Sequence, residues 1–442
     1  MKAIAIALTL LCVVLMFFVR REYKLAIMFV AAMLLSPLIL PFKGVTAKTA
    51  ISLGFLLSEA GNIRLHFRRI RKSVMLAYVI LALVSFVICV ITSPHLHSVA
   101  EMGFFGLTEL LTRSLAMVYG FMALRKTKSL SPLLNATFIP LIIMTVVGII
   151  NLFAGSSFYV EALLDEASDF SDLTRFRVQS TFNLPFDYGY MCVLVALLHI
   201  YGYMQKMENM SIMVTSQVCC LIGVLICNCR TVLFCYLICA LVYFVAIQRS
   251  RKVKLLVLAG AFLVGAFAVA TVPLARKMFL SLVSMFDPDA ISDGSTFTMR
   301  LRQLATVAKY LSESPVFGMG VHFFEQDLGW AEGASLAVDY DLAGLEGIHL
   351  NLLLERGIVG FTLFLAMVLI IVIYIIRCKR LGRLLYALGL SVWIGYMLFS
   401  FMTGELLSAV PTYYILGYVV ANMNLRDRFV KARKKMLMYA KS

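Results

Sequence analysis

The chain has 442 residues, of which 61% are hydrophobic, and a formal net charge of +16. Its mean hydropathy of +0.91 excludes a soluble fold, because a water-exposed surface could not cover that much apolar material. The Lys and Arg residues form short clusters between apolar runs, as membrane-protein loops do, so no nucleic-acid partner is expected. The runs are continuous and not alternating, which favours helices over an outer-membrane barrel.

Apolar runs in chain order predict an all-α, polytopic membrane protein. A helix needs about 20 apolar residues to cross the hydrocarbon core. The sequence predicts thirteen spans, or twelve if an early run is re-entrant or two runs merge. The first run ends without a cleavage site for a signal sequence. The predicted spans are 3–19, 25–41, 45–62, 73–93, 100–123, 133–154, 185–204, 210–228, 231–247, 254–273, 357–376, 384–402 and 405–422.

Six basic clusters predict the orientation. With thirteen spans, all six fall on the same side of the membrane, which the positive-inside rule makes the cytoplasm. The clusters are 20–24, 64–72, 125–128, 248–254, 377–383 and 426–436.

The longest outer connection divides the chain into three parts: N-terminal spans (1–273), an outer loop (274–356), and C-terminal spans with a basic tail (357–442). The loop has eleven carboxylates against six Lys and Arg residues, so it is acidic within a basic protein. A structureless loop of this length is unusual, so we expect it to be folded and functional. Residues 299–311 have the spacing of an amphipathic helix, which a Pro- and Gly-containing turn at 314–320 ends.

That helix has a predicted inner face and a predicted wet face. Arg300 falls at the edge of the inner face, so we expect it to point at the protein body. Arg302 and Lys309 fall on the wet face. The inner face consists of Leu301, Leu304, Ala308 and Leu311.

No metal site or cofactor is predicted. Nearly all of the ten cysteines lie inside apolar runs, where cysteine packs as a small hydrophobe. Cys227 and Cys229 form a C-x-C without a second pair, which does not suit zinc. Asp287 and Asp289 form an acidic pair that faces outward, away from nucleotide sugars. The sequence has no phosphate-binding P-loop and no dinucleotide fingerprint.

Polar residues at the outer face suggest a chemical site. Arg177 precedes the span that begins at Pro185, Arg230 lies at the tip of a two-span hairpin, and Arg300 and His349 lie on the long loop. Each has a simpler interpretation: an arginine that reaches the headgroups, a pair with a loop carboxylate, or a surface histidine. Glu109 and Arg113, inside a span, are interpreted as a buried ion pair.

Taken together, these residues suit an anionic lipid headgroup. Arginine binds phosphate with two parallel hydrogen bonds and keeps its charge. Histidine titrates near neutrality and can accept a proton from a hydroxyl. A diphosphate leaving group needs its developing charge neutralised by arginines or by a metal.

Four motifs in order resemble those of the O-antigen ligase and polymerase superfamily of bacterial membrane glycosyltransferases. They are "RVQSTFNLPFDYGYM", "CRTVLFCYL" with Cys229 where Ser is usual, "STFTMRLRQLATVAKYLSESPVFGMGVHFF", and "HLNLLLERGIVG". Each motif is weak alone, but their order and the long outer loop agree over about residues 130–422.

The resemblance implies a metal-independent enzyme whose donor is a glycan on undecaprenyl diphosphate. His349 matches the essential histidine of the family and Arg300 its loop arginine, while Arg230 and Arg177 match further basic positions. Asn351 is a possible site residue, although Leu350 separates it from the histidine. Glu355 is a possible substrate contact or, with Arg356, part of a salt-bridged rim.

The function expected is an outward-facing polymerase of lipid-linked repeat units for O-antigen, capsule or exopolysaccharide, in the inner membrane. The alternative within the class is a ligase that transfers the glycan to a lipid A core, as in lipopolysaccharide. Two other classes stay open: a flippase of lipid-linked sugars, and a scaffold in an export complex. Expected partners are the lipid-linked glycan, membrane lipid, and a chain-length regulator and flippase of the same pathway.

Overall fold

The computed structural model describes most of the chain, and the outer loop only in part. It covers residues 2–36, 38, 46–93, 106, 108–124, 130–164, 177–248, 250–271, 276, 297–321, 323, 347–403 and 410–439. His95, His97, His322 and the Asp287–Asp289 pair lie outside these residues.

The described residues form helices and contain no β-strand, which confirms the predicted all-α class. Three short elements join longer helices: η1 (Ala60–Asn62), the π-helical η4 (Glu109–Ser114) and η8 (Cys378–Leu381). The α-helices are α1 (Lys2–Phe18), α2 (Arg21–Leu34), α3 (Ala47–Glu59), α4 (Ile63–Arg71), α5 (Met75–Thr92), α7 (Ala116–Ala123), α8 (Ser131–Ala154), α9 (Phe158–Leu164), α10 (Pro185–Met204), α11 (Met210–Ile226), α12 (Arg230–Ile247), α13 (Arg251–Thr271), α15 (Phe297–Leu311), α16 (Ile348–Arg377), α17 (Arg383–Thr403) and α18 (Val410–Tyr439).

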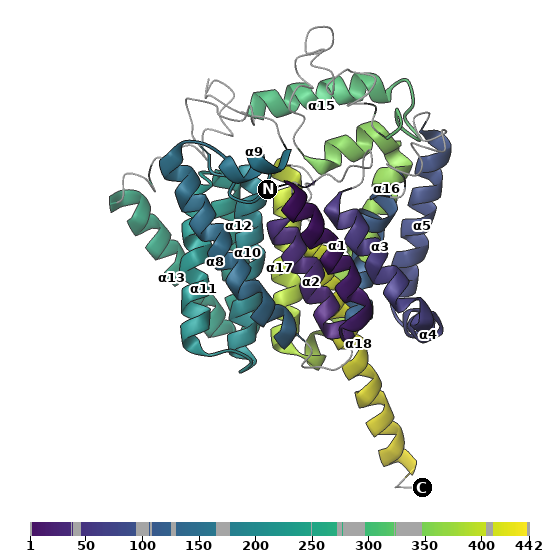
Figure 1. Cartoon of the computed structure of the whole chain (residues 1–442). Helices are drawn as coiled ribbons and strands as arrows, with labels where there is room; N and C mark the ends of the chain where they lie inside the picture. The colour runs from purple at the N-terminus through teal and green to yellow at the C-terminus, as the bar shows by residue number, and fades with distance from the viewer. Residues whose placement is uncertain are drawn as a thin grey trace.

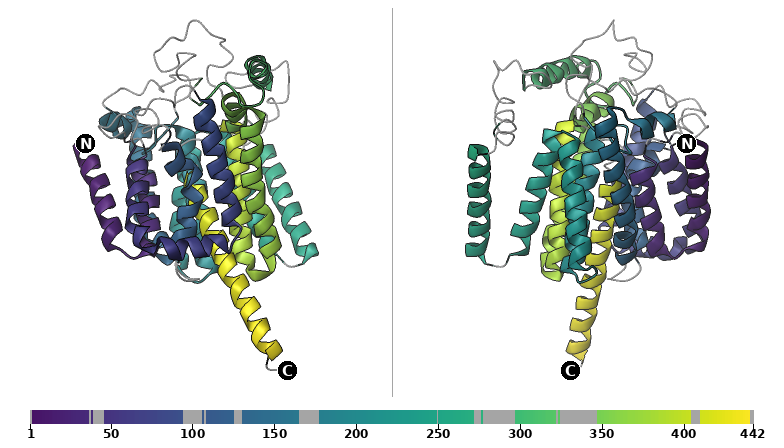
Figure 2. Two further views of the ribbon diagram at one scale, coloured as in Figure 1. Left: turned by 90° about the vertical axis from the view of Figure 1, so that its right-hand side faces the viewer. Right: turned by 60° about the vertical axis from the view of Figure 1, so that its left-hand side comes forward.

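The long helices run side by side as one bundle (Figures 1 and 2). The α15 helix lies across one end, and the C-terminal end of α18 projects from the other. Each predicted span overlaps described helices. Span 100–123 overlaps only η4 and α7, and α18 continues to Tyr439, well beyond the predicted end at residue 422. Among the described helices, five are long and apolar enough to cross a membrane: α5, α8, α12, α16 together with η8, and α17. Thus the chain is a multi-pass membrane protein, and the number of thirteen spans stays a prediction.

Two predicted boundaries differ from the structure in a way that matters. The span predicted to begin at residue 357 belongs to a helix that begins at Ile348. The basic cluster 64–72, predicted as a loop, forms α4, a helix with arginines in its last turn. Both errors arise because a hydropathy pattern marks where a segment enters lipid and not where its helical hydrogen bonds begin.

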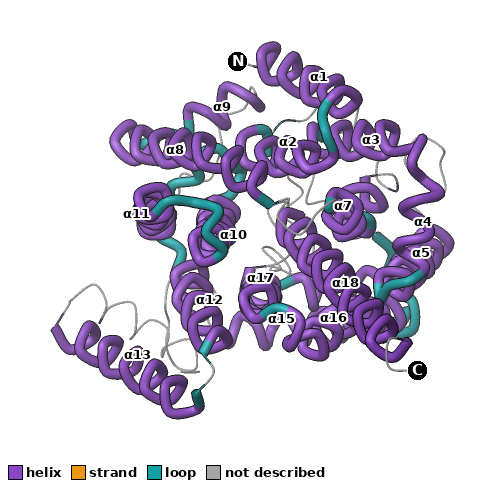
Figure 3. The backbone as a smooth tube through the Cα atoms, turned by 90° about the horizontal axis from the view of Figure 1, so that it is seen from below, coloured by secondary structure: helices purple, strands orange, loops and turns teal. Residues whose placement is uncertain are grey.

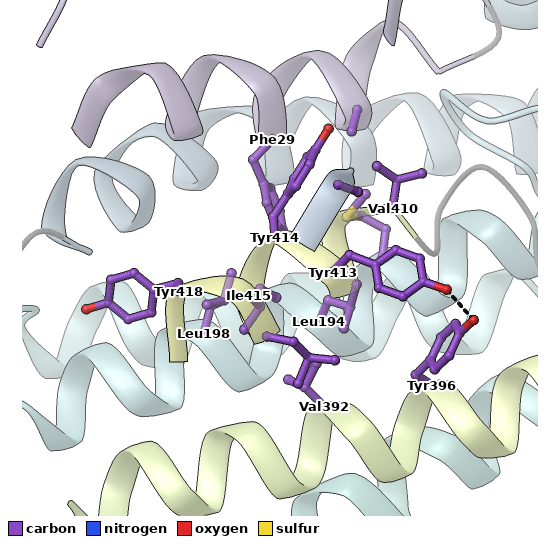
Figure 4. Packing of buried hydrophobic residues seen from close by; sticks show 14 of the residues in the cluster. Phe29, Leu194, Leu198, Val392, Tyr396, Val410, Tyr413, Tyr414, Ile415 and Tyr418 are labelled. Carbon is purple, nitrogen blue, oxygen red and sulfur yellow. Dashed lines mark hydrogen bonds between the residues drawn. The ribbon is translucent and has the colours of Figure 1, made fainter. Parts of the chain in front are cut away.

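The first half of α18 is the centre of the bundle. All its residues from Val410 to Asn424 are buried. Seen from below in Figure 3, α18 lies between α2, α7, α16 and α17. Large aromatic side chains fill the core around it (Figure 4). The hydroxyls of Tyr396 and Tyr413 are hydrogen-bonded to each other in this core, which satisfies two polar groups that lipid could not.

Two glycines allow α7 and α18 to touch. A Cβ atom on Gly417 would overlap the carbonyl oxygen of Met117, and one on Gly120 would overlap that of Tyr414. Small residues at such contacts let membrane helices approach backbone to backbone, where packing replaces the missing hydrophobic driving force. The position of α18 therefore depends on residues that carry no side chain.

We expect Gly417→Ala to lower the stability of the protein by about 1–3 kcal/mol or more, because the added methyl forces the two helices apart. Gly260→Ala is the matched control, since a Cβ at position 260 of α13 meets no atom within 4 Å. That control should be neutral or stabilising by up to about 1 kcal/mol. Thermal unfolding in detergent, followed by circular dichroism, measures both, and equal midpoints for the two variants would contradict the close contact.

Candidate active site

The helix after the long loop, α16, is broken into two arms at Gly357, whose φ of 60° and ψ of −165° are not helical. The short arm (348–356) carries His349 and the long arm (358–377) enters the bundle. In a straight helix residues 349 and 361 would lie about 18 Å apart along the axis. The ring centroids of His349 and Phe361 are instead 6.1 Å apart, so the short arm folds back over the start of the long arm.

The turn at 314–320 satisfies the backbone groups that this break exposes. Two carbonyls at the end of the short arm and two amides at the start of the long arm lose their helical partners. The four hydrogen bonds that replace them are Met319 N–H to Leu354 O at 2.8 Å, Gly320 N–H to Glu355 O at 2.9 Å, Ile358 N–H to Pro315 O at 3.1 Å and Val359 N–H to Val316 O at 3.1 Å. A non-helical backbone near lipid persists only where protein satisfies it in this way.

Gly318 and Gly357 make the approach of these two segments possible. A Cβ on Gly357 would lie 2.5 Å from the backbone nitrogen of Gly318, and one on Gly318 would lie 2.5 Å from that of Gly357. Both residues also have positive φ angles, 73° and 60°, which side chains disfavour. Two sequence motifs that lie far apart in the chain therefore form one structural unit.

His349 lies in the first turn of the short arm, two residues after Gly347, whose φ is 103°. The imidazole is half-buried among three aromatic rings, whose centroids lie 5.6 Å (Phe401), 6.0 Å (Phe364) and 6.1 Å (Phe361) from its own. The rings come from both the long arm and α17. They restrict the orientation of the imidazole, which a catalytic base requires.

The helix α15 lies over the short arm (Figure 1) and was predicted almost within its bounds. Val307 and Leu354 are buried against each other in a small cluster with Phe323, flanked by Tyr310 and Leu350. This contact joins the helix of Arg300 to the arm of His349.

The predicted inner face of α15 is wrong, however. Leu304 is 45% exposed and Ala308 is exposed, whereas Gln303, Thr306 and Val307 are buried. The short arm covers the face of α15 that carries Val307. The spacing of apolar residues in α15 does not show which of its faces the arm covers. The exposure of Lys309 is as predicted.

Arg300 lies in α15, and its side chain, like that of Arg302, lies outside the described part of the chain. The direction in which Arg300 points and its catalytic role both stay predictions.

Arg177 is exposed and precedes a short segment that is buried at the end of the bundle. The side chains from Val178 to Phe182 are all buried. Ser180 donates its hydroxyl to the carbonyl of Met144 at 2.6 Å, and Thr181 donates to that of Met33 at 2.7 Å. These two hydrogen bonds fix the segment to α8 and α2, so the backbone next to Arg177 is held in place.

Arg230 is the first residue of α12 and is half-buried. The amide of Val178 donates to the carbonyl of Ile226 at 3.4 Å, so the backbone of the Arg177 segment meets the hairpin that carries Arg230. Cys229, where the family usually has Ser, occupies the N-cap of α12 but makes no side-chain cap to it. Its thiol lies 3.2 Å from the carbonyl of Cys227 instead.

The predicted site residues therefore lie on three connected units at one end of the bundle. The short arm, the α15 helix and the paired segments of Arg177 and Arg230 all meet the end that α15 covers (Figures 1 and 2). Asn351 and Glu355 are half-buried on the short arm. Neither position is three, four or seven residues from His349, so neither shares its helical face.

The sequence did not reveal the charge cluster below His349. Arg356, seven residues on and thus on the same helical face, forms an ion pair with Glu109. Glu109 also pairs with Arg113 at 3.0 Å, and the Arg113 side chain is 41% exposed. The predicted Glu109–Arg113 pair is confirmed, but Arg356 and not Arg113 is its buried cation. The salt-bridged rim of Glu355 and Arg356 stays a prediction, since the partner of Arg356 described here is Glu109.

A second buried group, Lys48 and Asp187, was also missed. Their exposed fractions are 4% and 3%. The ammonium of Lys48 donates to Ser36 at 3.0 Å, and Asp187 attracts it electrostatically. Both residues interrupt apolar runs, and an ionisable residue inside a span is by itself a functional signal. They lie next to the Arg177 segment, since Ser36 follows α2 and Asp187 lies in the first turn of α10.

Metal ligands do not converge in the described part of the chain, where no group of three or more His, Cys, Asp or Glu residues could hold an ion. All ten cysteines are free thiols. The acidic pair at Asp287 and Asp289 is not described, so the prediction of a metal-free site is untested there.

This arrangement defines a class of protein: a helical, multi-pass membrane protein with basic and histidine side chains gathered at one end of its bundle. The family model described as O-antigen ligase matches residues 216–365. The match includes Arg230, Arg300 and His349, and it confirms the resemblance to the O-antigen ligase and polymerase superfamily. The match supports a membrane enzyme of the O-antigen ligase and polymerase type over these residues. Among curated proteins, none matches it.

We expect Gly357→Ala to release the short arm. The methyl meets the backbone of Gly318 and Val316, and the φ of 60° is unfavourable for alanine. Gly155→Ala is the matched control, because Gly155 has a φ of 64° with no atom within 4 Å of a new Cβ. The control should lose about 1–2 kcal/mol from the dihedral alone, and Gly357→Ala distinctly more.

Limited trypsin digestion measures the release directly, since cleavage after Arg356 requires that the arm leaves its ion pair. Gly357→Ala should be cut there faster than either the wild type or Gly155→Ala. Equal cleavage in all three proteins would show that the glycine contact does not hold the arm.

Proposed function

We propose that this protein is a glycosyltransferase that polymerises oligosaccharide repeat units carried on undecaprenyl diphosphate. The site would face outward from a bacterial inner membrane, opposite the basic clusters. The observation that supports this most is the folded-back arm of α16, which holds His349 at a fixed depth beside the helix of Arg300. A proton acceptor fixed near several arginines suits the displacement of a diphosphate by a hydroxyl.

In the proposed reaction, His349 accepts the proton of an acceptor sugar hydroxyl. The hydroxyl oxygen forms a bond to the anomeric carbon of the donor, with inversion, while the bond from that carbon to the diphosphate oxygen breaks. Undecaprenyl diphosphate leaves with the electron pair of that bond. The cleaved diphosphate linkage drives the transfer, so neither a nucleotide nor a metal is needed.

Arg300 and Arg230, with Arg177, would hold the departing diphosphate. A guanidinium binds phosphate oxygens in pairs and stays charged. The structure supports this assignment for Arg230 and Arg177 through the contact of their backbone segments. The charge on Arg356 is already paired with Glu109, so its proposed role is to hold the short arm and not to bind substrate.

Ligation of the finished glycan to a lipid A core is the second candidate. The family model that matches is described as an O-antigen ligase, which favours this function as much as polymerisation. The two reactions share a donor and differ in acceptor. Nothing in the match favours a flippase. A chain-length regulator and the flippase of the same pathway are proposed as partners.

His349→Ala should reduce transfer by about 10²–10⁴-fold, the usual contribution of a general base. Arg230→Gln should reduce it by about 10²–10³-fold, as loss of one charge-stabilising group does. Expressed in a strain lacking the gene, a polymerase variant leaves single-unit surface glycan, a ligase variant accumulates long chains on undecaprenyl diphosphate, and a flippase variant traps single units inside.

Two matched controls accompany these variants. Thr362→Ala changes an exposed position of α16 whose hydroxyl bonds only within its own helix, and Arg64→Gln removes an arginine from α4 at the opposite end. Both should keep wild-type glycan length. Unchanged glycan in His349→Ala and Arg230→Gln, at normal protein levels, would refute the mechanism.

The proposed orientation has its own test. A green fluorescent protein fused after residue 442 should fluoresce, because it folds in the cytoplasm, and alkaline phosphatase fused after residue 311 should be active, because it folds outside. The reverse result for both fusions would place His349 on the cytoplasmic side and overturn the proposed donor.

A further inference from the structure

A cavity of about 720 Å³, lined by both charged and apolar side chains, lies at the basic end of the bundle, opposite His349. It opens between the ends of α1, α2 and α3, with α4 and α18 as its other walls. Figure 3 shows that end from below. The residues that line it are Phe17, Val19, Arg20, Arg21, Lys24, Ser58, Glu59, Asn62, Leu65, Arg69 and Leu425.

Glu59 is the one carboxylate among these lining residues, and basic groups already surround it. Its side chain is 2% exposed. Its carboxylate oxygens lie 2.8 Å from a nitrogen of Arg21, 2.7 Å from the ammonium of Lys24 and 2.8 Å from a ring nitrogen of His66. Both carboxylate oxygens are engaged. The carboxylate therefore fixes the walls of the cavity, and it cannot neutralise the other cations that face it.

Four cations and one carboxylate line the cavity, a formal excess of three positive charges. Arg69 is half-buried; it donates to the carbonyl of Leu124 at 2.9 Å and lies 5.6 Å from the ring centre of Phe121. Burial, and then repulsion by Arg21 and Arg428, lowers the pKa of Arg69. Positive charges held this close together, partly out of water, favour a bound anion.

The surroundings of the cavity fit a lipid. The neighbouring helix α4 exposes Ile63 and Phe67, by 67% and 60%, four residues apart on one face. Such a helix lies in the membrane interface with its apolar side chains in the acyl region. Phe17 and Leu425 give the cavity an apolar wall next to its cations. A headgroup could bind the arginines while its chains stay in the bilayer.

We propose that this cavity is a binding site for a phosphate group, supplied by the headgroup of an anionic phospholipid. Arg20 and Arg69 bind the phosphate oxygens, and the Glu59 cluster holds the walls. The occupant bridges α1 and α2 to α4 and α18, so it stabilises the packing of the N-terminal helices on the central helix. This site is separate from the proposed active site and does not depend on the proposed reaction.

Native mass spectrometry of the delipidated full-length protein tests the proposal. We titrate the wild type with phosphatidylglycerol or with phosphatidylcholine. It should bind one molecule of phosphatidylglycerol more tightly than phosphatidylcholine. Arg20→Gln/Arg69→Gln should weaken that binding at least about tenfold, the loss expected when charge-assisted bonds to phosphate are removed. Arg64→Gln/Arg68→Gln removes the same charge from exposed positions of the same region and should stay within about twofold of wild type.

Two further measurements separate loss of binding from loss of folding, and a lipid headgroup from free phosphate. Leu425→Trp narrows the cavity beside its cations and keeps every charge, so it should also weaken binding while the unfolding temperature without lipid stays near that of wild type. Inorganic phosphate should compete with phosphatidylglycerol only at millimolar concentration. Tight binding of inorganic phosphate, without a preference for phosphatidylglycerol over phosphatidylcholine, would overturn the lipid as the source of the phosphate. The site itself would be overturned if both double variants lost phosphatidylglycerol binding equally, or if the wild type showed no preference between the two lipids.

Discussion

The contact between Gly318 and Gly357 is the constraint on which the candidate site depends. It lets the turn at 314–320 come close enough to donate and accept four backbone hydrogen bonds across the break in α16. Without those bonds the broken helix would expose unsatisfied amides and carbonyls at the membrane boundary, which costs several kcal/mol per group. The depth of His349 and the position of α15 both follow from this one contact.

Charge pairing then fixes the arm in a second direction. Arg356 reaches Glu109 on a segment that is far away in the chain. A buried guanidinium without a partner is strongly unfavourable, so the pair couples the arm to η4 and through it to α7. Since α7 contacts α18 across Gly120 and Gly417, the site end is connected to the central helix. At the basic end a carboxylate likewise holds distant segments together, since Glu59 bonds to Arg21, Lys24 and His66.

The candidate site could be predicted only in part, and particular residues show why. His349, Arg230 and Arg177 were recognisable because all three fall on the predicted outer face and lie in motifs that resemble those of one family. The partner of Arg356 was not, because an ion pair between Glu109 and a residue 247 positions away leaves no spacing to detect. The inner face of α15 was wrong for a related reason, since Leu304 and Val307 are both apolar and only the docked arm decides which is buried.

The sequence by itself determined the fold class, the helices and the end of the bundle at which each polar segment lies. These follow from local physics: apolar runs must be helical in lipid, and basic clusters stay on one side. Only the tertiary structure decided that α16 folds back at Gly357, that Glu109 holds Arg356, and that four cations surround one cavity. Those features depend on backbone contacts and charges from distant segments, which no local pattern encodes.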